Sequence, residues 1–161
     1  MAAPRRLPFA LVSLLLLASV GGCDLISEPH GGLLDEVEAN RATWEAQRPQ
    51  NYTYVLQHRC FCGEAAIGPV EVEVQGTTVV RRTYTGSGEE VSAQFESAFP
   101  RVEVLFTLLE EAAEADADDI QASFDPVLGV PVDFFIDYSD NIADEERGYE
   151  VLELPSEVAG G

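Results

Sequence analysis

Strict alternation of apolar and charged residues over residues 70–74 is the feature that most limits how this chain can fold. The segment reads Val-Glu-Val-Glu-Val, so three valines share one face of an extended strand and two glutamates share the other. Residues 130–138 show a similar alternation over a longer stretch. Strands with one apolar and one polar face are typical of an antiparallel sheet that other elements cover on its apolar side.

Two segments with helical character can supply that cover. Residues 33–48 are rich in helix formers, carry Glu–Arg pairs three residues apart, and place Trp44 on an apolar face, where we expect it in the core. Residues 102–113 contain the clearest apolar stripe of the chain, which consists of Val102, Leu105, Phe106, Leu109, Ala112 and Ala113.

Further strands are predicted from β-branched and aromatic runs between turn residues. They cover residues 51–60, 77–84, 119–124 and 148–154, in addition to the two alternating segments. The chain order is therefore helix, three strands, helix, three strands. This order predicts an α+β fold, in which an antiparallel sheet of about six strands packs against two helices.

The N-terminus predicts an exported protein. Arg5 and Arg6 precede an apolar run of about 14 residues, which is too short to span a bilayer, and two glycines follow it. This is the pattern of a signal peptide, to which we assign residues 1–22.

Residues 20–23, Val-Gly-Gly-Cys, resemble the lipobox of bacterial lipoproteins. The resemblance implies that Cys23 becomes the first mature residue and carries a thioether-linked diacylglycerol and an amide-linked acyl chain such as palmitate. Two or three acyl chains anchor a protein stably, whereas one does not. We therefore expect a bacterial cell-envelope protein that is lipid-anchored to a membrane and faces the extracytoplasmic side.

Composition divides the remaining chain and limits its partners. Residues 23–32, with Pro29 and a Gly-Gly pair, are predicted to be the lipidated tether, residues 33–155 a single domain and residues 156–161 a flexible tail. The chain carries 29 acidic and 9 basic residues, a formal net charge of −20. Such a field repels nucleic acid, so we expect an envelope protein partner and the membrane contact through Cys23 instead.

The segment His-Arg-Cys-Phe-Cys-Gly-Glu at residues 58–64 carries the most reactive side chains. In a strand, His58, Cys60 and Cys62 point to the same side. If Cys23 is acylated, Cys60 and Cys62 form an even pair in an oxidising compartment, which favours a disulfide. An extended strand holds their Cα atoms about 6.6 Å apart, so the bond requires a local bend.

Two other uses of these side chains stay open. A strained, reducible bond suits a thiol-redox protein, in which Arg59 could stabilise a thiolate. Two thiolates and the imidazole of His58 could also hold copper(I) or zinc, although a closed zinc site needs four ligands. With no fourth ligand in view, the sequence leads us to assign no metal and no cofactor.

Carboxylates gather in a second region, which contains Asp137, Asp140, Asp144, Glu145 and Glu146. Their spacing does not match a calcium-binding EF-hand loop and lacks its central glycine, so we interpret the region as a solvated loop. The sequence also contains none of the common hydrolase, zinc-protease or nucleotide-binding motifs. We therefore assign no catalytic residue.

Several segments together resemble a family of bacterial lipoproteins known as domain of unknown function 6174. They include Trp44, residues 52–63, residues 70–76, residues 99–112 and, most specifically, the Asp-Pro-x-x-Gly-x-Pro turn and strand within residues 124–151. The resemblance runs from Trp44 to Leu154. It implies a secreted, membrane-tethered α+β domain and supplies neither an activity nor a catalytic residue.

The sequence thus supports two hypotheses about function. The first is a membrane-anchored, non-catalytic binding or interaction module of the envelope. The alternative is a thiol-redox protein that acts through Cys60 and Cys62.

Overall fold

A computed structural model describes residues 30–139, 141–142 and 144–158. The predicted signal peptide, Cys23 and residues 24–29 of the predicted tether lie outside the described residues. Within this part of the chain, no helix combines the length and the apolar character needed to cross a membrane.

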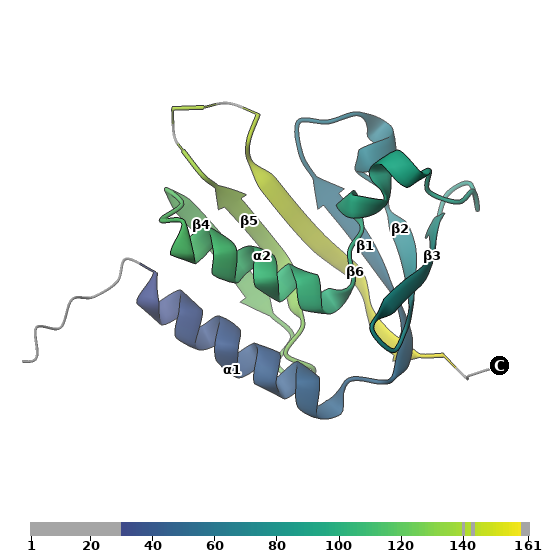
Figure 1. Cartoon of the computed structure of the whole chain (residues 1–161), viewed down its shortest axis with the longest axis horizontal. Coiled ribbons are helices and arrows are strands. Elements are labelled where there is room, and N and C mark those ends of the chain that lie inside the picture. The colour runs from purple at the N-terminus through teal and green to yellow at the C-terminus, as the bar shows by residue number, and fades with distance from the viewer. Residues whose placement is uncertain (1–29, 140, 143, 159–161) are drawn as a thin grey trace, which may run out of the picture.

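The fold confirms the predicted α+β class: six antiparallel strands and two main helices (Figure 1). The elements are α1 (Gly31–Gln47), β1 (Asn51–Arg59), η1 (Glu64–Ala66), β2 (Val70–Gln75), β3 (Thr78–Tyr84), η2 (Ala93–Ala98), α2 (Val102–Glu114), β4 (Asp119–Phe124), β5 (Pro131–Asp137) and β6 (Arg147–Glu157).

The sheet consists of two three-stranded halves. Its order is β3-β2-β1-β6-β5-β4, so β1–β3 form one half and β4–β6 form the other. The halves meet where β1 pairs with β6, in an antiparallel ladder with two register irregularities. The first and the last strand of the domain therefore lie side by side at the centre of the sheet.

Both helices lie on the same face of the sheet, and the core fills the space between them and the strands (Figure 1). All six residues of the predicted α2 stripe are buried, as is Trp44 on α1, which packs edge-on against Tyr52 of β1 at a centroid distance of 5.3 Å. The valines of residues 70–74 face the same core. The 3.6-residue and two-residue periods thus identified the buried faces correctly.

Two boundaries differ from the predicted ones. Helix α1 begins at Gly31, so the two glycines that we placed in the tether belong to the helix. Strand β6 continues to Glu157, two residues past the predicted end of the domain at residue 155. Pairing with β1 explains this extension, because Thr53 lies opposite Ser156 and Tyr52 opposite Glu157.

The turn between β4 and β5 explains the most specific motif of the sequence. Asp125 accepts hydrogen bonds through Oδ1 from the amides of Val127 (3.0 Å) and Leu128 (2.6 Å), which closes the turn. Gly129 has a positive φ of 74°, and a Cβ atom there would lie 2.3 Å from the carbonyl oxygen of Asn40 in α1. The turn packs directly on the helix backbone, so the motif has a structural role.

The sheet has two chemically different ends. We call the end where β1 finishes at Arg59 and β6 starts at Arg147 the cysteine end; it carries residues 60–63 and the 138–146 loop. We call the opposite end the glutamate end; it carries the β2–β3 turn, the 125–130 turn and Glu103 in the first turn of α2. The N-terminus of the described chain lies near the cysteine end, because His30 Nε2 hydrogen-bonds the Ala117 carbonyl (2.9 Å) just before β4.

Candidate functional site

The cysteine end brings together the three reactive side chains that the sequence singled out. Strand β1 stops at Arg59, and the chain bends through residues 60–62 before η1. The Cα atoms of Cys60 and Cys62 are 5.2 Å apart and their sulfurs are paired as in a disulfide. The predicted bend is therefore present, whereas the predicted continuous strand is wrong: a turn, not strand alternation, gathers His58, Cys60 and Cys62.

The bend also determines which atoms solvent can reach. Cys62 is exposed and Cys60 is half-buried. Phe61 between them points away from the core, with 86% of its surface exposed. An exposed sulfur and an exposed aromatic ring thus lie next to each other on a short, covalently constrained segment.

His58 lies beneath this bend and is only 9% exposed. Its Nδ1 is 3.0 Å from the Ala66 carbonyl oxygen and 3.4 Å from Cys60 Sγ, and its ring stacks on Tyr149 at a centroid distance of 4.6 Å. Its Nε2 is buried and has no hydrogen-bond partner among the described residues. A buried polar atom without a partner is uncommon and calls for an explanation.

Burial lowers the pKa of His58, and the nearby positive charge of Arg147 lowers this pKa further. The hydrogen bond to Ala66 opposes both effects without cancelling them. The imidazole is therefore neutral at neutral pH and keeps a lone pair on one ring nitrogen.

A hollow of about 440 Å³ opens beside these side chains. Carboxylates from the 138–146 loop line it together with Arg147. One of them, Glu145, has a buried Oε1 that lacks a hydrogen-bond partner within the described chain. The predicted acidic loop therefore contributes to the same site as the cysteines, through Asp144, Glu145 and Glu146; Asp140 lies outside the described residues.

The contacts of Arg59 do not match the expected role of stabilising a cysteine thiolate. Its guanidinium forms an ion pair with Asp133 (2.8 Å) and also donates to the carbonyl oxygens of Phe134 and Tyr149 at 3.3 and 3.5 Å. These bonds hold it across β6 on the sheet face away from the helices. Its charge is already paired, which weakens the argument that it stabilises a thiolate.

An apolar depression lies on this second face. It measures about 330 Å³ and is lined by Arg59, Cys60, Phe61, Phe135 and Glu146. We call these five residues the Phe61 patch. Phe135 lies between Asp133 and Asp137 on the same side of β5, and it lines this depression together with Phe61.

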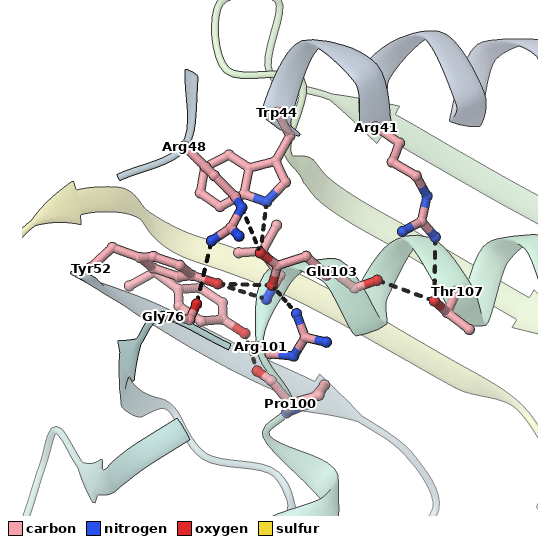
Figure 2. A network of polar contacts seen from close by, with 11 residues as sticks. Arg41, Trp44, Arg48, Tyr52, Gly76, Pro100, Arg101, Glu103 and Thr107 are labelled. Atoms are coloured by element: carbon pink, nitrogen blue, oxygen red, sulfur yellow. Dashed lines mark hydrogen bonds and ion pairs between the residues drawn. The ribbon is translucent and has the colours of Figure 1, made fainter. Parts of the chain in front are cut away.

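The glutamate end contains a second polar cluster, centred on Glu103 (Figure 2). Glu103 Oε1 accepts from Trp44 Nε1 (3.4 Å) and pairs with Arg48 Nε (3.4 Å). Its Oε2 accepts from Tyr52 Oη (3.2 Å) and pairs with Arg101 Nη1 (2.8 Å). The side chain of Glu103 is 12% exposed, and its four partners come from α1, the residue after α1, β1 and the residue before α2.

This cluster is saturated. A carboxylate has about four lone-pair sites, and all of those of Glu103 are used. Burial and the charge of Glu103 raise the pKa of Tyr52, and burial raises that of Tyr54, whose hydroxyl donates to the Pro100 carbonyl. Both tyrosines stay protonated donors, so the cluster joins the helices to the sheet and offers no free group to a ligand.

Sequence analysis missed the Glu103 cluster. The available signal was weak: an acidic residue in the first turn of a helix, which the helix dipole favours, with Arg101 two residues before it. Nothing in the sequence shows that residues 44, 48 and 52 converge on position 103.

Comparison with known proteins gives one result. A family model described as "Family of unknown function (DUF6174)" matches residues 36–155. The resemblance that the sequence suggested is confirmed at the level of the family. Comparisons with curated proteins and with solved structures give no match.

Proposed function

Because this chain belongs to the DUF6174 family, whose function is unknown, we propose from its geometry that it is a non-catalytic binding module that contacts a protein partner through the Phe61 patch. A lipid on Cys23 holds it at the bacterial cell envelope, on the extracytoplasmic side. The observation that carries the proposal is the 86% exposure of Phe61 on a constrained bend.

The energetics favour a contact at this position. Burying a phenylalanine side chain contributes about 1.5–3 kcal/mol, and this ring is left in water. The paired cysteines on either side limit the motion of its backbone, so little conformational entropy is lost when a partner covers it. Exposed, rigid aromatic residues are the typical anchors of protein interfaces.

Charge indicates the kind of partner. Glu146 borders the patch, Asp133 neutralises Arg59 beside it, and the chain as a whole carries a formal charge of −20. A complementary surface has an apolar pocket for Phe61 and a basic rim, which also accelerates association.

The position of the tether supports a partner close to the membrane. His30 lies at the cysteine end of the sheet, the same end as Phe61. The seven residues from Asp24 to His30 span at most about 25 Å when extended. A lipid on Cys23 therefore keeps the Phe61 patch near the bilayer.

Site-specific photocrosslinking tests the contact. A benzophenone amino acid replaces Phe61 in one full-length variant and Val127 in a control; Val127 is also apolar and 69% exposed, but lies at the opposite end of the sheet. We expect a discrete protein adduct in intact cells from position 61 alone. Equal adducts from both positions, or none, contradict the proposal.

The anchor is tested separately. Intact mass spectrometry of the membrane-extracted protein should show loss of residues 1–22 and added diacylglycerol and acyl mass, and Cys23→Ala should abolish both changes. A full-length, unmodified chain in the cytosol contradicts the lipoprotein assignment.

A thiol-redox function is the second possibility, and one observation favours it. The exposed Cys62 sulfur is open to attack by an incoming thiolate, which forms a mixed disulfide and releases Cys60, whose Sγ lies 3.4 Å from His58 Nδ1. The two electrons and two protons that restore both thiols come from a substrate dithiol, which becomes a disulfide. Equilibration with glutathione buffers measures the reduction potential of the Cys60–Cys62 bond. A potential below about −300 mV identifies a structural disulfide and excludes the redox role.

A further inference from the structure

We propose that the reduced form of the cysteine end is a binding site for one thiophilic metal ion of the zinc class. Cys60 and Cys62 supply two thiolates, His58 supplies an imidazole nitrogen, and Glu145 completes the coordination. The sequence led us to assign no metal, because it showed only three ligands; in the structure Glu145 lines the same hollow as these three, outside the cluster that they form, and is the candidate for the fourth. This inference does not depend on the proposed binding function.

Geometry supports the first three ligands. One ligand atom from each of His58, Cys60 and Cys62 lies within 4.8 Å of the other two. An ion with bonds of about 2.0–2.3 Å to nitrogen and sulfur fits between atoms at such separations. Reduction also frees the two sulfurs to move apart to the distances that coordination requires.

Unsatisfied polar atoms provide an independent indication. In the part of the chain that the structure describes, the buried side-chain atoms without a hydrogen-bond partner are His58 Nε2 and Glu145 Oε1. Both residues line the hollow that Cys60 and Cys62 also line. Two buried polar groups left unpaired beside one cavity cost free energy, and a shared ligand that engages both residues can recover it.

The charge of the surroundings selects a cation. Asp144, Glu145 and Glu146 line the hollow, and Arg147 is the one basic residue among the described lining residues. Two thiolates add two further negative charges when the protein is reduced. A divalent ion with mixed sulfur, nitrogen and oxygen ligands matches this donor set better than calcium or magnesium, which prefer oxygen alone.

Metal binding and disulfide formation exclude each other here. An external dithiol or phosphine donates two electrons, and two protons are taken up as Cys60 and Cys62 become thiols. Binding of the ion then releases both thiol protons. Reoxidation by an external disulfide, which accepts two electrons and two protons and becomes a dithiol, restores the sulfur–sulfur bond and expels the ion. Because Cys62 is exposed, the ion exchanges with solvent instead of being sealed in the fold.

The experiment uses cobalt(II) as a spectroscopic probe on the full mature domain, reduced with a phosphine under anaerobic conditions. We expect about one equivalent to bind, with the thiolate-to-cobalt charge-transfer and d–d bands of a tetrahedral site, and zinc to displace it. The oxidised protein should show neither signal. Circular dichroism checks that each variant remains folded.

Variants assign the ligands. Cys60→Ser and Cys62→Ser should each abolish the charge-transfer band, and His58→Gln should weaken cobalt binding at least tenfold. Glu145→Gln should also weaken it about tenfold, whereas Glu64→Gln, an exposed glutamate outside the hollow, should not.

Two results overturn the proposal. The first is the absence of a charge-transfer band when the reduced, folded protein meets micromolar cobalt. The second is binding that persists unchanged when both cysteines are serine, which shows ordinary association with surface carboxylates. Crosslinking at Phe61 is measured on the oxidised protein, so failure of one proposal is distinguishable from failure of the other.

Discussion

The two ends of the sheet differ in how fully their buried polar groups are hydrogen-bonded. At the glutamate end, one carboxylate with 12% exposure has four partners and all its lone pairs are engaged. At the cysteine end, a histidine with 9% exposure has a ring nitrogen without a partner in the described chain, and the ring of Phe61 on the nearby bend is 86% exposed. Polar groups whose hydrogen bonds are all made hold elements together, whereas polar groups without a partner remain available to a ligand.

The comparison predicts that the glutamate end contributes most of the stability. Glu103→Ala leaves two arginines, a tyrosine and a tryptophan without their acceptor, and we expect it to lower the free energy of unfolding by about 3–4 kcal/mol. Glu111→Ala, on the exposed side of the same helix, should change it by less than about 0.5 kcal/mol. Urea denaturation of both variants measures the difference. Similar losses of unfolding free energy in the two variants would show that the Glu103 network does not hold the helices to the sheet.

A second substitution tests the close packing of the turn at this end. Gly129→Ala adds a Cβ atom 2.3 Å from the Asn40 carbonyl oxygen, at a φ of 74°. We expect a loss of about 3 kcal/mol, which combines backbone strain with displacement of the turn.

Gly76→Ala is the matched control for Gly129→Ala. Its φ is also positive, at 61°, but nothing lies within 4 Å of the added atom. Backbone strain alone should cost about 1 kcal/mol. The difference between the midpoints of thermal unfolding of the two variants measures the effect of the contact with α1. Equal midpoints would show that α1 shifts to accommodate the added Cβ atom.

The cysteine end should tolerate change better. Replacing both Cys60 and Cys62 with serine removes a link that closes a very short loop, for which chain entropy predicts a loss of only about 1–2 kcal/mol. Under oxidising conditions the double variant should remain folded, and denaturation should show it to be less affected than Glu103→Ala. A larger loss than that of Glu103→Ala would reverse the comparison.

The smallest expected effect is a pH dependence carried by His58. Its pKa is lower in the folded state than the ordinary value of about 6.5, so the unfolded chain binds more protons below that pH. Its contribution is present above about pH 6.5 and is lost as the pH falls, with a slope of at most about 1.4 kcal/mol per pH unit for one proton.

Denaturation between about pH 7.5 and 5.5 measures this slope, since most carboxylates stay ionised there. The His58→Gln variant should show a flatter dependence than the wild type. A steeper dependence in the variant would mean that the folded state holds the His58 proton more tightly, contrary to the burial argument.

Sequence patterns predicted what depends on local periodicity. The α2 stripe, the alternation at residues 70–74 and the burial of Trp44 follow from periods of 3.6 and two residues, which the core enforces. Prediction failed where a partner lies far away in sequence. Glu45 and Arg48 were expected to pair within α1, yet Arg48 pairs with Glu103, because the packing of α1 on α2 places that buried carboxylate within reach.

The candidate site shows the same division. His58, Cys60 and Cys62 were identified because they are neighbours in sequence, and the structure does place them together. Glu145, Phe135 and the carbonyl of Ala66 could not be assigned to them. Glu145 and Phe135 reach this end through the pairing of β1 with β6 and of β6 with β5. The Ala66 carbonyl reaches it through the 60–67 segment, which a hydrogen bond from the His58 amide to the Ile67 carbonyl (2.8 Å) closes. Neither arrangement follows from a periodic pattern.

The central position of β6 has a consequence for biosynthesis. The two halves of the sheet are joined by the ladder between β1 and β6. Strand β6 begins at residue 147, so the ribosome makes it last. A growing chain that stops before β6 holds a three-stranded β1–β2–β3 meander and a separate β4–β5 hairpin, and an isolated hairpin is marginally stable in water. The sheet can therefore close only once almost the whole polypeptide has been synthesised.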